Sequence, residues 1–295
     1  MDSKSYNEMK QHLVEVYSQT VKAVKDGHYT AEDGTKVTLD DDREMRQNSK
    51  FYSRRFTVND IPAYDTPTDI EVINTDSISA GKQLADAGYR PAVLNFASRT
   101  KAGGGVLNGS RAQEESLFRQ TNLFRSLYQF TGIATKYGVE QNSRQYPMDR
   151  QFGAVYTPYD TVLRGGVKDD FPFLAHPFKL SFIAVAAVNK PQLTPDKKEI
   201  IGKGLELTKS KMRTILRVGL AHGHDSLVLG AFGCGAFHNP PSHIARLFKE
   251  IINSPEFKNK YRKIVFAIIE NHHSGSDINS EGNLKPFLDV FGQSN

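Results

Sequence analysis

The sequence predicts an α/β protein in which helices cover both faces of a mixed β-sheet, as a three-layer α/β/α sandwich. Short, mostly apolar strands are expected at 69–74, 91–98, 226–232 and 262–269. Segments with helical periodicity lie between or beside them, at 75–88, 198–223 and 241–254. Apolar strands that alternate with helices indicate crossover connections and largely parallel neighbours. Two further strands, near 152–157 and 179–187, and a last helix complete the predicted domain.

An amphipathic helix is expected near the N-terminus, at residues 5–25. Its apolar positions follow helical spacing: Met9, Leu13, Val16, Tyr17 and Val21. A polar, turn-rich stretch follows from Asp26 to Asp60. We therefore divide the chain into an N-terminal helical extension, residues 1–65, packed on a main domain at 66–295. For the helix at 75–88, Thr75 is the expected N-cap.

Composition places the chain among soluble globular proteins. Of its 295 residues, 38% are hydrophobic and 24% are charged, a balance far from that of disordered chains. The single cysteine, Cys234, excludes an intrachain disulfide and zinc sites built from clustered cysteines. No apolar run approaches the ~20 residues of a membrane helix, and the charged N-terminus is unlike a signal peptide. We expect a cytoplasmic protein, or a nuclear one in a eukaryote, with no membrane segment.

The net charge of +5 favours polyanionic partners such as nucleic acids or nucleotides. A charge of this size is nevertheless ordinary for the length, and no run of five like charges occurs. Charge alone therefore does not identify the partner.

A glycine-rich loop follows the strand expected at 91–98. Three consecutive glycines, Gly103, Gly104 and Gly105, let backbone N–H groups approach a phosphate or a ribose without interference from a Cβ atom. Taken alone, GGG is better explained as a tight turn. After seven further residues, however, the sequence QEE opens a helix that is expected to run to about Tyr128.

Two adjacent glutamates, Glu114 and Glu115, stand in the first turn of that helix. Acidic residues there favour the helix dipole, but this does not account for a pair beside a glycine loop. Neighbouring helical side chains point about 100° apart, so they cannot both face one atom. One carboxylate can bind a hydroxyl while the other transfers a proton. Hydrolysis of a glycoside needs a proton on the leaving oxygen and an activated water, and one carboxyl can serve both steps in turn.

A second glycine-rich loop, LGAFGCGAFHNPP, runs from Leu229 to Pro241. It ends a strand and leads into a helix that begins at Pro240 or Pro241, so its N–H groups can bind a diphosphate. The pattern is neither a Walker loop nor GxGxxG and is weak by itself. Because ligands bind at the carboxyl ends of the strands in such sheets, we expect both loops at one edge, where they suit a ligand that carries sugars and a diphosphate.

The order GGG, seven residues, QEE resembles the signature of poly(ADP-ribose) glycohydrolases. The segments VLNFASRTKAGGGVLNGSRAQEESLFRQTNL and LGAFGCGAFHNPP are similar to the microbial-type branch of that family, and LNFAS resembles the VNAAN-type segment of macrodomains. The resemblance covers roughly residues 70–270. It implies a macrodomain-like catalytic domain that hydrolyses ribose–ribose O-glycosidic bonds of poly(ADP-ribose) and releases ADP-ribose, with no cofactor and no metal. The implied partners are poly(ADP-ribose), ADP-ribose and ADP-ribosylated proteins, and nucleic acid enters only as a modified target.

The same resemblance assigns roles to the matching residues. Glu115 is implied to protonate the leaving ribose 2′ oxygen and to activate water, Glu114 to bind ribose hydroxyls, and Gln113 to support the loop. Asp76 is implied to hold the adenine amino group, and Asn95 matches the asparagine at a strand end. The other implied substrate contacts are backbone-rich: Gly103, Gly104 and Gly105 at the distal ribose and phosphate, and Gly233, Cys234, Gly235, Ala236 and Phe237 along the diphosphate.

One position departs from the pattern, because Ser98 stands where many macrodomains have asparagine, and a hydroxyl reaches less far than an amide. Two other functions stay open beside chain hydrolysis. One is removal of single ADP-ribose units from protein or nucleic acid. The other is a non-catalytic ADP-ribose reader, which needs the glycine loops but not Glu115.

Cys234, with His238 and His243 nearby in sequence, is also compatible with a Cys/His hydrolase. A small residue that fills a tight loop is the simpler interpretation.

Two histidine pairs, His222/His224 and His272/His273, are candidates for metal binding, but no HExxH motif or carboxylate cluster accompanies them. Polar residues in surface connections explain them more simply. Phe266, in the last strand, either stacks on adenine or fills the core.

Overall fold

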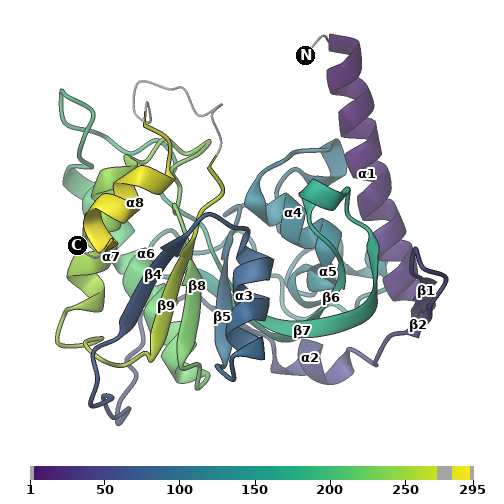
Figure 1. The fold of residues 1–295 in the computed structure, drawn as a ribbon, viewed down its shortest axis with the longest axis horizontal. Coiled ribbons are helices and arrows are strands. Elements are labelled where there is room, and N and C mark those ends of the chain that lie inside the picture. The colour runs from purple at the N-terminus through teal and green to yellow at the C-terminus, as the bar shows by residue number, and fades with distance from the viewer. Residues whose placement is uncertain (1–2, 271–280, 293–295) are drawn as a thin grey trace. The chain divides into compact units, whose positions relative to one another are not determined.

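The computed structural model describes residues 3–270 and 281–292. The chain divides into two compact units, each assembled from three segments that are distant in sequence. The first unit comprises Met1–Phe51, Ala97–Met148 and Val155–Phe182, and the second comprises Tyr52–Phe96, Asp149–Ala154 and Ile183–Asn295. Figure 1 labels the helices and strands of both.

The second unit is built on four strands that run in the order β5-β8-β9-β4 (Figure 1). They are β4 (Asp69–Ile73), β5 (Pro91–Phe96), β8 (Ser226–Leu229) and β9 (Lys263–Ala267). All three pairings are parallel. β5 and β8 are buried almost throughout, as their continuous apolar runs predict for strands covered on both faces.

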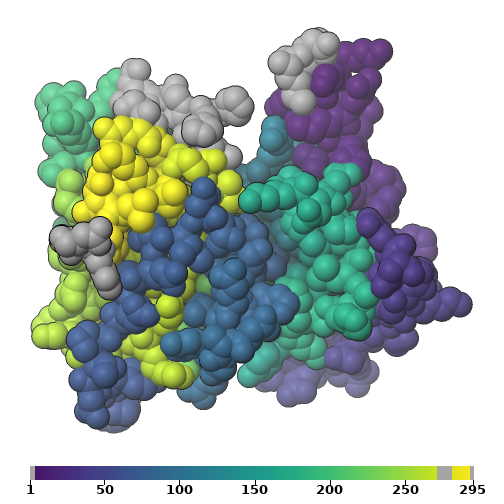
Figure 2. Space-filling model, in the orientation of Figure 1, coloured from purple at the N-terminus to yellow at the C-terminus, as the bar shows by residue number. Residues whose placement is uncertain are grey.

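Helices α3 (Ser77–Asp86), α6 (Gly202–Ala221), α7 (Pro241–Ile252) and α8 (Leu284–Phe291) belong to the same unit. α3 packs on β5 and β8, while α8 packs on α7 and on β4. In Figure 2, α8 is the yellow region next to the blue region that contains β4. The expectation for the N-cap of α3 was wrong. Asp76, not Thr75, caps this helix, because its Oδ1 accepts a 2.9 Å hydrogen bond from the Ser79 N–H.

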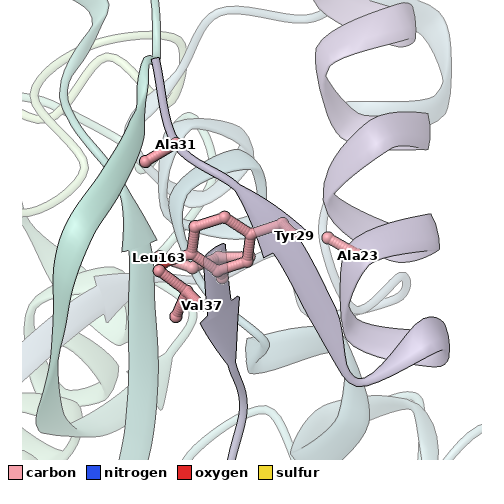
Figure 3. Packing of buried hydrophobic residues seen from close by; sticks show 5 residues of the cluster. All are labelled: Ala23, Tyr29, Ala31, Val37 and Leu163. Carbon is pink, nitrogen blue, oxygen red and sulfur yellow. The ribbon is translucent and has the colours of Figure 1, made fainter. Parts of the chain in front are cut away.

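The first unit begins with α1 (Ser3–Asp26), which confirms the predicted N-terminal helix. The polar stretch after it contains short elements that its composition did not reveal: β1 (His28–Thr30), β2 (Lys36–Thr38), α2 (Arg43–Asn48) and β3 (Lys50–Tyr52). Strands of three residues are too short to show alternation. Figure 3 shows how Tyr29 of β1 and Val37 of β2 pack with Ala23 of α1 and Leu163, and so attach this end of α1 to the core.

The remaining elements of the first unit follow the glycine loop. They are η1 (Val106–Asn108), α4 (Gln113–Gln120), α5 (Leu123–Tyr128), η2 (Ala134–Tyr137), β6 (Ala154–Arg164), η3 (Val167–Asp169) and β7 (Phe173–Val185). Strands β3, β6 and β7 are neighbours in that order. β6 and β7 are longer than the strands predicted near 152–157 and 179–187. The prediction for β6 stopped early because Pro158 and Asp160, residue types that strands disfavour, lie within it.

The single helix expected up to Tyr128 is instead divided into α4 and α5. Thr121 adopts an extended conformation and forms an antiparallel bridge with Val162. The Asn122 side chain then accepts a 2.7 Å hydrogen bond from the Thr161 N–H. Pairing with β6 therefore interrupts a helical pattern that the sequence carries without a break.

The predicted α/β class, with a mixed sheet and an N-terminal helix, is confirmed. Within residues 3–270 and 281–292, no helix is both long enough and apolar enough to cross a bilayer.

Candidate active site

The loop between β5 and α4 turns back on the first turn of α4. Gly103 and Gly104 have φ values of +80° and +56°, which are accessible to glycine at little cost. The turn brings the backbone N–H groups of the loop next to the side chains of Glu114 and Glu115. All of these residues belong to the first unit.

Glu114 holds the two sides of this loop together. Its Oε2 accepts a 2.7 Å hydrogen bond from the Ser98 N–H, and its Oε1 accepts a 3.0 Å bond from the Gly103 N–H. The residue is only 3% exposed. A carboxylate that accepts backbone N–H bonds on both oxygens is strongly stabilised in its charged form. Glu114 thus acts as a structural centre of the loop, and its implied contact with ribose stays a prediction.

Glu115 differs from its neighbour in having one oxygen without a partner. Oε1 accepts a 2.7 Å hydrogen bond from the Gly105 N–H. Oε2 is buried and makes no hydrogen bond to any residue in the described ranges. Native proteins rarely leave a buried carboxylate oxygen in this state, and each such case needs a functional or structural explanation. Oε2 of Glu115 is therefore the oxygen of the acidic pair that has no partner among the described residues.

Gly104 is the residue that makes room for this carboxylate. A Cβ atom on Gly104 would overlap with Oε1 of Glu115. The absence of a side chain at this position is therefore required by the acid itself, and not only by the turn.

Arg119 lies one helical turn after Glu115 and is almost fully buried. Its Nε donates to the Leu13 carbonyl at 2.9 Å, and its Nη2 donates to the Ser110 carbonyl at 2.7 Å. Burial lowers the pKa of Arg119 to about 10, an effect that the nearby Glu115 opposes. Our sequence analysis did not select this residue. The available signal was its i, i+4 spacing from Glu115 on the same helix.

Ser98 and Gln113 flank the acidic pair. The Ser98 hydroxyl accepts a 3.3 Å hydrogen bond from the Lys101 N–H, so this side chain helps to close the turn. Gln113 is the first residue of α4 and is half-buried. The supporting role that the resemblance implies for Gln113 stays a prediction.

The second glycine loop connects β8 to α7 in the second unit. Asn239 organises it: its Nδ2 donates to the carbonyls of Val188 and Gly233, at 2.8 and 3.0 Å. Sequence reasoning missed Asn239, although an asparagine before two prolines is a recognisable turn signal. The loop presents backbone at its tip, because Gly235 and Ala236 are exposed.

Cys234 is a buried residue of this loop, and burial raises the pKa of its thiol well above the usual range. A thiol in such surroundings is not a thiolate nucleophile at neutral pH. The Cys/His hydrolase alternative therefore loses its nucleophile.

Asp76 and Asn95 also lie in the second unit. Besides its capping bond, Asp76 accepts a 2.6 Å hydrogen bond from the Ser79 hydroxyl on Oδ2. Asn95 stands at the end of β5, fully buried, and neither its amide nitrogen nor its amide oxygen finds a partner in the described part of the chain. A buried amide with both atoms unsatisfied is a second candidate for ligand binding.

The histidine pair His222/His224 makes structural hydrogen bonds, His222 Nε2 with the Tyr52 hydroxyl (2.8 Å) and His224 Nδ1 with the Arg90 carbonyl (3.0 Å). His272 and His273 lie outside the described residues.

Phe266 fills the core of the second unit. Its ring is fully buried and contacts three other rings, those of Phe248, Phe287 and Phe291. The two interpretations left open by the sequence are thereby resolved in favour of packing.

A buried acidic pair on a glycine loop, with one carboxylate oxygen unpaired, defines a candidate acid–base site. A family model described as the catalytic domain of microbial-type PARG, the poly(ADP-ribose) glycohydrolase, matches residues 18–165, half of the chain. The chain belongs to this family. No match was found among curated proteins.

Similar solved structures come from two bacteria. The structure of poly(ADP-ribose) glycohydrolase from Thermomonospora curvata is 24% identical, with 95% of this chain and 99% of that chain covered and a TM-score of 0.74. The same enzyme bound to the inhibitor ADP-HPD is 23% identical, with coverages of 94% and 98% and a TM-score of 0.72. The Deinococcus radiodurans enzyme in complex with ADP-ribose is 26% identical, with coverages of 86% and 98% and a TM-score of 0.65.

Proposed function

We propose that this protein hydrolyses ribose–ribose O-glycosidic bonds in poly(ADP-ribose) and releases ADP-ribose, with Glu115 as general acid and base. The observation that carries the proposal is the buried, unpaired Oε2 of Glu115 beside the glycine loop. Family membership supports it, as does the similarity to bacterial glycohydrolases whose structures contain ADP-ribose or an inhibitor.

The chemistry needs one carboxyl group in two protonation states. In the first step, the protonated carboxyl of Glu115 gives its proton to the ribose 2′ oxygen as the bond to the anomeric carbon breaks. The oxocarbenium-like centre that forms is positively charged and is favoured by the carboxylate just produced. In the second step, the same carboxylate takes a proton from water, whose oxygen bonds to the anomeric carbon. Because Gly105 holds Oε1, Oε2 is the oxygen that carries the proton.

The remaining assignments are part of the same proposal. Glu114 and Gln113 shape the loop, and Gly103, Gly104 and Gly105 lie against the distal ribose and phosphate. In the second unit, Asp76 and Asn95 contact the nucleoside, and the diphosphate follows the second loop at Gly233, Cys234, Gly235, Ala236 and Phe237. We also propose that the fold is macrodomain-like and that the protein is cytoplasmic and acts on ADP-ribosylated proteins or nucleic acids.

The test is incubation of the protein with three substrates: poly(ADP-ribose) of defined length, mono-ADP-ribosylated protein and mono-ADP-ribosylated DNA. Chromatography separates the products. We expect free ADP-ribose and shortened chains from the first substrate. Release from only the mono-modified substrates would identify a mono-ADP-ribosyl hydrolase. Binding of ADP-ribose without cleavage of any substrate would identify a reader.

A further inference from the structure

A continuous series of hydrogen bonds joins helix α1 to the carboxylate of Glu115. Arg119 donates from Nε to the Leu13 carbonyl of α1 and from Nη2 to the Ser110 carbonyl of the loop. Ser110 in turn donates its N–H to the Gly105 carbonyl at 3.2 Å. Gly105 donates its N–H to Oε1 of Glu115 at 2.7 Å. The position of the acid is thus connected to α1 through one buried side chain.

Direct packing reinforces this connection. Gly109 has φ +70°, and a Cβ atom there would overlap with the backbone carbonyl of Lys10 and lie 2.8 Å from its Cα. A Cβ atom on Gly105 would overlap with the Ser110 hydroxyl. At Gly109 the loop therefore has no space for a side chain on the side that faces α1.

Helix α1 is itself anchored at several points along its length. The Thr20 hydroxyl donates to the Arg119 carbonyl at 2.7 Å, and the hydroxyls of Tyr17 and Tyr128 are hydrogen-bonded at 2.9 Å. Ala23 packs into the cluster of Figure 3. A helix held in this way is a rigid support for the loop.

We propose that Arg119 is a positioning residue that fixes the catalytic loop against α1, and that α1 is therefore part of the catalytic apparatus. The inference rests on the proposed function of Glu115. A buried guanidinium is costly unless its donors are used. Its planar fork reaches two carbonyls at once, which the single ammonium of lysine does not reproduce. Arg119 contacts the backbone of α1 at Leu13 and that of the loop at Ser110, and so acts through the loop.

Arg164 provides a matched control in the same unit. It is also a buried arginine, and burial lowers its pKa to about 10 as for Arg119. Its Nη1 donates to the Phe171 carbonyl at 2.5 Å, and its Nη2 donates to the side-chain oxygen of Gln19 in α1 at 2.9 Å. Arg164 thus also links a backbone carbonyl to α1. Its partners do not include the glycine loop. Substituting it therefore reproduces the general cost of changing a buried arginine next to α1.

The experiment compares wild type with R119K and R164K. We measure kcat and KM on defined chains, stability in urea, and hydrogen exchange of the Gly105 and Ser110 amides. In R119K we expect kcat to fall at least about tenfold, because a small displacement of a catalytic group costs a large factor in rate. KM should change less than about threefold, since the change affects the proton-transfer step more than binding. The two amides should exchange faster in R119K but not in R164K.

A kcat of R119K within twofold of wild type would overturn the proposal, as would an equal loss in R164K at equal stability. If R119K does not fold, T20V decides, because it removes the Thr20 hydroxyl, which donates to the Arg119 carbonyl and, within α1, to the Val16 carbonyl. For T20V we expect faster exchange of the Gly105 amide and a fall in kcat of about threefold, a factor within the range that one ordinary hydrogen bond contributes. If both the exchange rate and kcat of T20V equal those of wild type, the proposal is overturned. If wild type cleaves no substrate, the proposed function fails, and amide exchange still tests the positioning by Arg119.

Discussion

Gly104 and Glu115 are eleven positions apart and occupy the same corner of the site. A Cβ atom on Gly104 would overlap with Oε1 of Glu115 and lie 3.1 Å from Oε2 of Glu114. The glycine loop is therefore shaped around the two carboxylates. This contact explains why position 104, in a loop whose N–H groups bind the two carboxylates, has no side chain.

Replacing Gly104 by alanine should disable the enzyme while leaving it folded. The new methyl group displaces Glu115, and the φ of +56° adds strain of ~1–2 kcal/mol to the folded state. We expect kcat to fall by about 10²-fold. Gly88 is the control, because its φ is +82° but nothing lies within 4 Å of an added Cβ. G88A should lose similar stability and keep its activity. Equal activity of the two variants would contradict the steric argument.

The stability of the protein should depend on Glu114 more than on Glu115 when each is replaced by glutamine. Glu114 accepts hydrogen bonds from the N–H groups of Ser98 and Gly103, one on each carboxylate oxygen. Glutamine has a single side-chain oxygen, so in E114Q one of these N–H groups loses its acceptor, and stability should fall by ~1–3 kcal/mol. In E115Q, the amide oxygen can still accept from Gly105, and the loss of the attraction to Arg119 is offset by removing a buried carboxylate oxygen that has no hydrogen-bond partner among the described residues, so stability should be nearly unchanged. Urea unfolding of the two variants checks this. A more stable E114Q would show that Glu114 is not the structural member of the pair.

Asp160 should make the protein less stable as pH rises. This buried side chain in β6 accepts a 2.8 Å hydrogen bond from Ser126, and burial raises its pKa to about 7. The unfolded value is about 3.9, so between these values the folded state holds a proton that the unfolded state has released. Stability therefore falls as pH rises from about 4 to 7 and then levels off.

The variant D160N removes this titration. Its stability relative to wild type should rise by about 2–4 kcal/mol between pH 4.5 and pH 8, on the order of 1.4 kcal/mol per pKa unit. Urea unfolding at several pH values measures the difference, so that other titrating groups cancel. Parallel stability curves for D160N and wild type would show that Asp160 does not titrate in this range.

Much of the fold could be predicted because long periodic segments carry their own signal. The strands β4, β5, β8 and β9 and the helices that connect them follow the apolar pattern. The elements that were missed depend on tertiary contacts. The break between α4 and α5 arises because Thr121 pairs with β6, and three-residue strands such as β1 are formed only against a partner.

For the site, the sequence identified the acidic pair and the glycines but not what holds them. Glu115 stands out because its neighbour is also a glutamate and a GGG segment precedes it. From the sequence, Arg119 is an ordinary residue inside the helix that was expected to run to about Tyr128. Its role depends on the carbonyls of Leu13 and Ser110, which no local pattern places near it.

The most direct test of the account is E115Q assayed on poly(ADP-ribose) of defined length, together with calorimetric titration of ADP-ribose. The account predicts that kcat falls by at least about 10³-fold, since one group serves as acid and base, while the Kd for ADP-ribose changes less than about threefold. Cleavage of chains by E115Q at a rate near that of wild type would contradict it.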